Sequence, residues 1–273
     1  MSGRPGTTGR LLHAACIALL ALVGLGGSAR AQQDVSLQLE AFGGVGAFRP
    51  GDMVGVRVGI RNTLEEPMEC LLQWDLPNAD GDMTAHTRGV TVSPGQPAQR
   101  WLYARLPPGS AAAIANEVCT VRLFETREGR RVRELCALRF KPMEAAQPPM
   151  PVEMQEGLIA VVGDGRMGLE TMEATMSGDS VPAMQEVTRI TSALKPASLP
   201  DRWEGLASCE AILWSGSAGP QGLGNDRALA LLDWIERGGH LVIVPPETGD
   251  AWGLLGARGH VLSELLPTSG VRR

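Results

Sequence analysis

Three glycines follow an apolar run at a spacing that could hold a phosphate group. Leu158 to Gly168 is LIAVVGDGRMG, which gives G-x-G-x-x-G at Gly163, Gly165 and Gly168. In a dinucleotide site such glycines let the backbone approach a pyrophosphate at a helix N-terminus. That fingerprint also needs an acidic residue after the next strand, where Thr191 to Ala193 has none. We therefore expect a tight turn that needs glycine geometry, and no cofactor.

A serine after a later apolar run could act as a nucleophile. Ser215 to Gly219 is SGSAG, a small-x-nucleophile-x-small pattern centred on Ser217. Pro220 delays the helix that should follow such an elbow at once. Residues that could complete a triad follow in a permitted order: Asp233, His240, Asp250 and His260. A secreted serine hydrolase using Ser217 stays open as an alternative.

The same two loops could instead bind a small molecule. Both follow strand-like runs, and open α/β sheets bind ligands at the carboxyl ends of their strands. A sensor of small molecules is the second alternative. Its candidate ligand-binding residues are Gly163, Asp164, Gly165, Ser215 and Ser217.

The cysteines indicate no metal or redox site. Cys70, Cys119, Cys136 and Cys209 form no C-x-x-C pair. Cys119 and Cys136 stand in neighbouring strand-like runs, so a disulfide between them and two buried free thiols are both open.

Other polar and aromatic residues favour structural roles. Asn78 to Asp82 lacks the spacing of a calcium loop and predicts a polar hairpin tip. His86 is expected at the surface. Trp74 and Trp101 are expected in the core or on a sheet face, in preference to carbohydrate stacking.

The first 31 residues have the features of a secretory signal peptide. Two arginines precede an apolar stretch, Leu11 to Leu25, and an A-x-A site ends at Ala31. Cleavage there removes three arginines, which leaves 22 basic against 30 acidic residues, a net charge of about −8. We expect an exported, periplasmic or cell-surface protein that does not bind nucleic acid, since nucleic acid favours a basic surface.

Residues 34–142 predict an antiparallel β-sandwich. Met53 to Asn62 alternates valine or isoleucine with glycine or arginine, the period of a half-buried strand. Six further runs, separated by turn residues, complete about seven strands. These runs are Val35–Leu39, Met68–Leu76, Gly89–Val92, Arg100–Leu106, Val118–Phe124 and Val132–Phe140.

A proline-rich linker, residues 143–156, leads to an α/β domain over 157–273. Gly157–Val162, Glu186–Ile190, Ala211–Trp214 and His240–Val244 are expected as buried parallel strands. Asp226–Arg237 is an amphipathic helix, capped by Asn225 or Asp226 and ended by Gly238-Gly239. Its expected inward residues are Leu229, Leu231, Leu232 and Ile235.

Two resemblances follow from these segments. Phe48 to Gly51, with the strand after it and Asn62, resembles the start of Ig-like modules in bacterial envelope proteins. The second segment resembles the class I glutamine amidotransferase-like domain of large envelope proteins. The matching positions are Leu199-Pro200, Trp203, Gly205-Leu206, Ala211–Trp214 and Gly238-Gly239.

The second resemblance implies a fold without the activity. Cys209, the cysteine of this segment, precedes a strand, whereas the amidotransferase nucleophile follows one. Such proteins usually continue into further strands and a membrane helix, so a truncated form of a longer, membrane-anchored chain stays open. We expect an Ig-like sandwich followed by a flavodoxin/amidotransferase-like α/β domain, which acts as a non-catalytic binding or structural module for an envelope protein partner.

Overall fold

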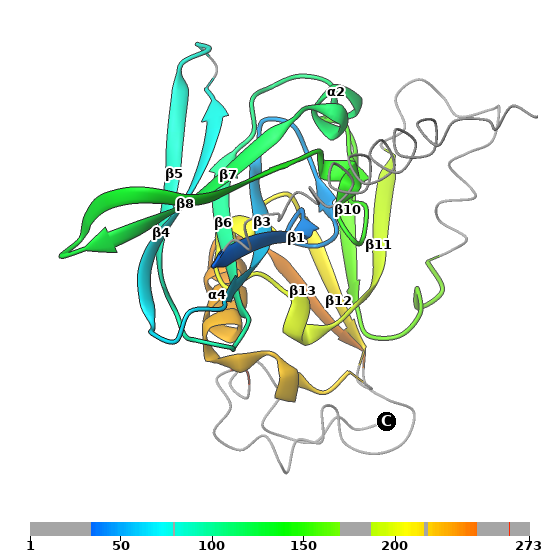
Figure 1. Ribbon diagram of the computed structural model, residues 1–273. Helices are drawn as coiled ribbons and strands as arrows, with labels where there is room; N and C mark the ends of the chain where they lie inside the picture. Colours follow the sequence, from blue (N-terminus) through cyan, green and yellow to red (C-terminus); the bar gives the residue numbers. More distant parts are fainter. Residues whose placement is uncertain (1–33, 79, 170–186, 216–217, 245–261, 263–273) are drawn as a thin grey trace, which may run out of the picture. The chain divides into compact units, whose positions relative to one another are not determined.

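The computed structural model describes residues 34–78, 80–169, 187–215, 218–244 and 262 (Figure 1). The signal peptide predicted over residues 1–31 lies outside them. Within the described residues, no helix is long and apolar enough to cross a membrane. From Val35 onward the chain forms one compact unit, and its strands fall into several sheets, so the prediction of a β-rich fold is confirmed.

Two antiparallel sheets hold the seven strands predicted in the first half of the chain (Figure 1). The three-stranded sheet has the order β1 (Val35–Phe42), β3 (Met53–Asn62) and β6 (Ala98–Arg105). The four-stranded sheet has the order β5 (Met83–Val92), β4 (Met68–Pro77), β7 (Cys119–Arg127) and β8 (Arg130–Phe140). Strand β3 has the predicted bounds. Strand β5 begins at Met83, before the predicted Gly89, and this first part was missed because most of its residues are polar or small. A short helix, α2 (Ala111–Asn116), was not predicted.

The core between these sheets comes from the alternating apolar positions. Val54, Val56, Val58 and Ile60 of β3 are all buried. Trp74 is fully buried and packs edge-on against Phe42. The turn between β4 and β5 is the predicted polar tip, where Asn78 Oδ1 accepts hydrogen bonds from the backbone N–H groups of Asp80 and Asp82.

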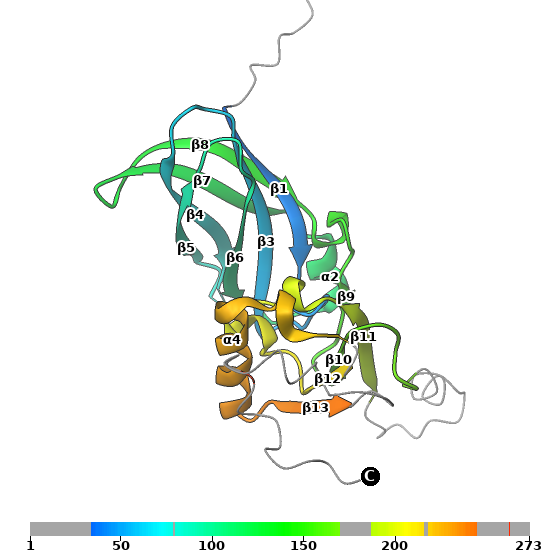
Figure 2. The ribbon, with the colours of Figure 1, turned by 90° about the horizontal axis from the view of Figure 1, so that it is seen from below.

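A parallel sheet forms in the second half of the chain. Its order is β11 (Thr188–Leu194), β10 (Gly157–Val162), β12 (Ala211–Ser215) and β13 (His240–Val244). Helix α4 (Gly224–Glu236) connects β12 to β13 and packs on one face of the sheet (Figure 2). Single 3₁₀ turns, η2 (Pro196–Ser198), η3 (Trp203–Leu206) and η4 (Pro220–Gly222), occupy the connections around β12.

Three expectations about this half were wrong in detail. Leu229 is 51% exposed, whereas Leu231 is buried and Leu232 and Ile235 pack partly buried against the core, as expected. Ala228, Ala230 and Trp234 are the buried residues of α4 that were not expected. The helix begins at Gly224, so neither Asn225 nor Asp226 caps it, although Gly238, with φ +99°, ends it as expected. Strand β13 is not buried, because it lies at the edge of the sheet and exposes Val242 and Val244.

The predicted linker is packed against the rest of the fold. Pro142–Glu144 forms a 3₁₀ turn, η1, and β9 (Met150–Pro151) pairs in parallel with β2 (Ala47–Phe48). Val152 is fully buried in the core under the parallel sheet. Val45 and Ala47, from the connection between β1 and β3, enter the same core. The parallel sheet therefore shares its core with segments from the sandwich and the linker.

Candidate functional site

The carboxyl end of the parallel sheet brings two of the predicted loops together. Gly163 follows β10, Ser215 ends β12, and these two strands are neighbours. A Cβ atom on Gly163 would lie 2.7 Å from the Cβ atom of Ser215. This point lies where the strand order 2-1-3-4 reverses direction, which is where open α/β sheets bind ligands.

The glycines of this edge have the conformations that the turn requires. Gly163, Gly165 and Gly168 have φ values of +110°, +78° and +81°, in the region that side chains disfavour. Asp164 and Gly165 are exposed. Strand β11 continues to Leu194 and is followed by Lys195, so the residue after this strand is basic. The backbone geometry of this turn therefore explains why these three positions are glycine.

The structure places His240, one of the two histidines that could serve as the base for Ser217, away from the end of β12. Ser217, Asp250 and His260 lie outside the described residues. His240 pairs with Ala211 at the start of β12, whereas Ser215 pairs with Val244 at the other end. Four residues of strand separate the two ends by about 13 Å. His240 therefore lies at the amino end of the parallel strands, too far away to activate a nucleophile beside Ser215 at their carboxyl end.

The four cysteines in the described part of the chain, Cys70, Cys119, Cys136 and Cys209, are buried and free. Cys119 pairs with Phe140, and Cys136 lies four residues further along the ladder, opposite Leu123. That offset of about 13 Å exceeds the reach of a disulfide, about 7 Å between Cα atoms. The disulfide alternative for Cys119 and Cys136 is wrong.

Burial keeps these thiols protonated. It raises the pKa of Cys70 and Cys136 to about 11 and that of Cys119 and Cys209 to about 12. Cys209 precedes β12, and its Sγ donates to the carbonyl of Ala211. Cys209 therefore lies at the amino end of the parallel strands, whereas Gly163 and Ser215 lie at their carboxyl end.

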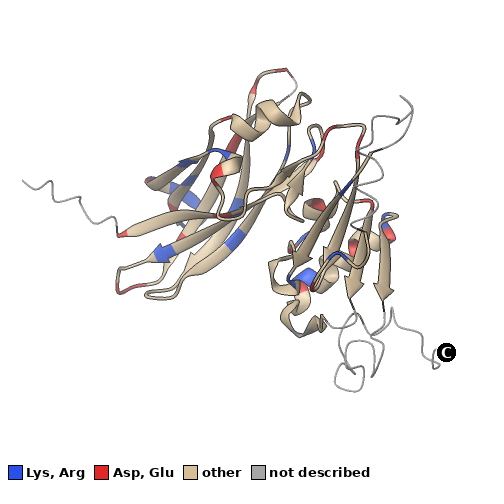
Figure 3. Cartoon of the chain, turned by 90° about the vertical axis from the view of Figure 1, so that its right-hand side faces the viewer, with Lys and Arg blue, Asp and Glu red and all other residues tan. Residues whose placement is uncertain are grey.

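The remaining candidates are structural where they are described. Trp74 and Trp101 are at most 2% exposed, too buried to stack on a sugar. His86 is half-buried, and burial lowers its pKa. Over the described parts of the chain, no group of three histidine, cysteine or carboxylate side chains could hold a metal ion. Acidic and basic residues are interspersed over the strands (Figure 3).

A site that sequence reasoning missed lies on the outward face of β3. Gly55 and Gly59 leave space there, because a Cβ atom would lie 2.9 Å from the Trp101 ring and 2.7 Å from Glu40 Oε1, respectively. Arg57, between them, stacks over the Trp101 ring at 5.4 Å. The two glycines in a strand were the available signal, since glycine there often marks a close approach by another segment.

Asp201 connects this face to the segment before the third parallel strand. Its Oδ1 accepts hydrogen bonds from Tyr103 Oη and from Arg88, both at 2.9 Å. Its backbone N–H donates to Tyr103 Oη at 3.0 Å. Burial, together with the Asp201 charge, raises the pKa of Tyr103, so its hydroxyl stays protonated and donates. Gly44 and Gly205 touch nearby, where a Cβ on Gly44 would lie 1.8 Å from the Gly205 carbonyl oxygen.

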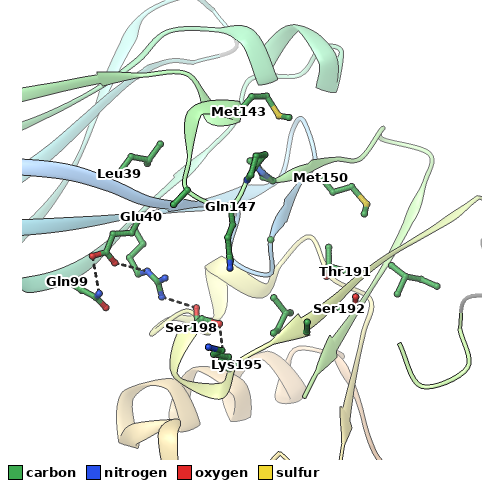
Figure 4. Close-up of a pocket in the computed structure, with 18 of the residues that line it drawn as sticks. Leu39, Glu40, Gln99, Met143, Gln147, Met150, Thr191, Ser192, Lys195 and Ser198 are labelled. Atoms are coloured by element: carbon green, nitrogen blue, oxygen red, sulfur yellow. Dashed lines mark hydrogen bonds and ion pairs between the residues drawn. The ribbon is translucent and has the colours of Figure 1, made fainter. Parts of the chain in front are cut away.

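A cavity of about 780 Å³ opens between β1, residues 143–150 of the predicted linker and β11 (Figure 4). On one wall Glu40 is 3.2 Å from Arg57 Nε and accepts a 3.0 Å hydrogen bond from Gln99. Arg57 also reaches the carbonyl of Ser198 at 3.5 Å. The opposite wall comes from β11, and Met143 and Met150 contribute apolar surface.

The β11 wall is irregular. The parallel register shifts between Ala160 and Val162, and Ala193 has φ +59°, which is rare for a residue with a side chain. Bulges and left-handed residues of this kind concentrate beside binding sites, where they redirect side chains.

The chain was compared with known proteins. No family model matches it, and no curated protein matches it. Solved structures match parts of this chain at low TM-scores. For the first of them, this chain covers only 33% of the length of the matched protein. A Pseudomonas fluorescens alkylpurine DNA glycosylase bound to DNA has 12% identity over 45% of this chain and 33% of that one, with a TM-score of 0.26. A Pyrococcus furiosus CARDB domain has 12% identity over 40% and 86%, with a TM-score of 0.25. The Bacillus subtilis sporulation control protein Spo0M has 15% identity over 40% and 47%, with a TM-score of 0.23. Matches at this level carry no functional argument.

Proposed function

We propose that this chain is an exported, non-catalytic binding or structural module of the cell envelope, which presents its parallel-sheet half to a protein partner. The observation that carries the proposal is the fixed connection through Asp201, which holds Tyr103 and Arg88 at 2.9 Å. A sandwich joined in this way is suited to hold its neighbour in one orientation, which a presenting module requires.

The proposal includes the finer architecture. We infer an Ig-like sandwich because its strands are arranged 1-2-5 and 4-3-6-7, two sheets of a seven-stranded antiparallel sandwich. We infer a flavodoxin/amidotransferase-like domain because its four parallel strands have the order 2-1-3-4. Export is inferred from residues 1–31 alone, and it predicts a mature chain that begins at Gln32, which N-terminal sequencing of the natural protein would test.

A pull-down from solubilised envelope fractions tests the partner. The wild-type chain is expected to recover one protein in a fixed ratio. Asp201→Ala, which releases Tyr103 and Arg88, should recover less, whereas Glu69→Ala, at an exposed acid on β4 of the sandwich, should match the wild type. Recovery of no protein by any of the three would count against the proposal.

The serine hydrolase remains the competing proposal, since Ser217 follows β12 at the carboxyl end of the parallel strands, where open α/β sheets place their sites. A fluorophosphonate probe separates the two. We expect no labelling of the wild-type chain, because His240 lies at the other edge. Labelling that disappears in Ser217→Ala would establish the hydrolase instead. The small-molecule sensor at Gly163 and Ser215 would be detected by ligand-induced shifts in the melting temperature.

A further inference from the structure

We infer that the tip of the β7–β8 hairpin, residues 127–133, binds the surface of an anionic phospholipid membrane. Its arginines contact the lipid phosphates, and an exposed valine among them enters the apolar layer beneath the headgroups. The inference goes beyond the protein partner proposed above and does not depend on it, because it concerns only this chain and a lipid surface.

The tip projects from the sandwich. Strand β7 pairs with β4 as far as Glu125, which lies opposite Cys70. Beyond that position, among the described residues, β7 pairs with β8 alone. The turn at Glu128 lies three residues further on, which is about 10 Å of strand. Figures 1 and 2 both show this hairpin projecting from the rest of the sandwich. Since salt screens charges over a similar distance, the tip can touch a flat anionic surface without strong repulsion of the acidic remainder of the chain.

The arginines of the tip outnumber the acids that could neutralise them. Arg127 and Arg133 share one carboxylate, that of Glu125, at 2.9 Å and 2.7 Å. Arg130 and Arg131 form no salt bridge with an acid in the part of the chain that the structure describes. All four arginines are exposed. Guanidinium groups with free N–H donors suit phosphate, which they can bind through two hydrogen bonds.

The next acid along β8 does not cancel this charge. Glu134 lies 3.7 Å from Arg122, so it is engaged with a different arginine. Residues 125–133 hold four arginines against two glutamates, a net charge of about +2, whereas the whole chain has a formal net charge of −5. A positive tip on an acidic chain directs that tip toward an anionic surface.

The apolar residues of the tip favour lipid over other polyanions. Val132 is 51% exposed, and the register of the hairpin shifts there, so β7 offers it no partner. The Arg131 guanidinium lies over the Phe124 ring, 5.1 Å from its centre. Basic and apolar side chains side by side are typical of segments that lie in a membrane interface. A second copy of this chain is disfavoured, because pairing along the edge strand β8 would bring arginines close to arginines.

Co-sedimentation with vesicles tests the inference on the chain from Gln32 onward. Residues 1–31 are left out because their apolar stretch would itself bind lipid, and the chain from Val35 onward is one compact unit. The chain should bind vesicles of equimolar phosphatidylglycerol and phosphatidylcholine at least about tenfold more tightly than vesicles of phosphatidylcholine alone. Raising the ionic strength about tenfold should release most of it, because the arginines are exposed.

Two pairs of variants, all at exposed positions, locate the contact. Arg130→Gln should weaken vesicle binding about fivefold, whereas Arg105→Gln should not change it. Arg105 lies near Leu76, at the other end of β4 from the tip. Val132→Ser should weaken binding about fourfold, the effect of one buried CH₂ group. Val118→Ser is its control, since Val118 is 49% exposed and precedes the other end of β7.

A duplex DNA oligonucleotide is the competing polyanion. The chain should bind it more weakly than the anionic vesicles, and Val132→Ser should leave the binding to DNA unchanged, because a valine adds nothing to a phosphate contact. DNA binding as tight as vesicle binding would overturn the inference, since the tip would then recognise polyanions in general.

The inference is equally overturned if anionic vesicles bind no better than neutral ones, or if Arg130→Gln or Val132→Ser behaves like its control. The pull-down depends on Asp201, which lies outside the tip. Failure of this inference and failure of the proposed function can therefore be told apart.

Discussion

The core of the sandwich and the core of the parallel sheet are built in different ways. The sandwich core comes from the strands of residues 35–140, from helix α2 and from Ala145, and Phe42 packs edge-on against Trp74 and Phe140 within it. The core of the parallel sheet includes Val45, Ala47 and Val152, which belong to the sandwich connection and the linker. The first is therefore built within residues 35–145, whereas the second also uses residues from the sandwich connection, which makes its stability dependent on the sandwich.

The largest test of this dependence is Gly44→Ala. Its new Cβ would overlap the Gly205 carbonyl oxygen at 1.8 Å, so the backbone of one of the two segments must move. We expect a loss of more than about 3 kcal/mol in the free energy of unfolding, measured with urea. Gly89→Ala is the control, since a Cβ there would have no neighbour within 4 Å. Equal stabilities for the two variants would contradict the shared contact.

A second test concerns the helix of the parallel half. Leu231→Ala should cost about 3 kcal/mol, because Leu231 is fully buried in the same core as Trp214. Leu229→Ala should change the unfolding free energy little, since Leu229 is 51% exposed. Thermal unfolding of both variants checks the face of α4, and a loss for Leu229→Ala as large as that for Leu231→Ala would restore the inward position expected for Leu229 from the sequence.

A third test removes the polar connection between the halves. Asp201→Ala should cost about 2 kcal/mol, because it leaves Tyr103 and Arg88 without their shared acceptor. In a double-mutant cycle with Tyr103→Phe, the two losses should not add, since both remove the same hydrogen bond. Additive losses would show that the contact does not stabilise the chain.

The smallest effect should depend on pH. Burial alone raises the pKa of Glu156, but hydrogen bonds from Arg189 and from the backbone N–H of Glu153 outweigh it and bring the pKa below its usual range. Such a carboxylate stabilises the fold above its unfolded pKa of about 4.3, and this contribution disappears as the pH falls through the folded pKa. Glu156→Gln should therefore cost about 1 kcal/mol at pH 7 and almost nothing in strong acid. A cost that is constant with pH, measured by urea unfolding, would contradict this.

Periodicity predicted the sandwich strands well, because one face of each strand is buried against a partner sheet. The alternation in β3 gave its bounds at Met53 and Asn62. The same alternation could not reveal that side chains of the neighbouring strands, Trp101 and Glu40, lie over Gly55 and Gly59, since glycine looks alike beside solvent and beside a packed side chain. On α4, Ala228 is buried and Leu229 is exposed, so weighting residues by their apolarity favoured the wrong one of the two.

The candidate site was predicted only in part. The edge with Gly163 and Ser215 was expected from strand-then-glycine patterns, and the structure brings these two residues together. The cavity was not expected, because its walls come from Glu40, Met143 and Ala193, which no local pattern connects. The cysteine alternatives could be separated only by the strand register.

The order in which the chain is synthesised gives the shared core a further consequence. Arg49, which follows Val45 and Ala47, contacts Glu210, 161 residues later. A nascent chain would present the two apolar residues, with their partners not yet made, while most of the second half is still on the ribosome. The sandwich would fold early, but the connection between β1 and β3 would remain exposed and accessible to chaperones until β12 had left the ribosome. Ribosome-bound chains halted before and after β12 should therefore differ in protease sensitivity between Gly43 and Pro50, far upstream of the halt.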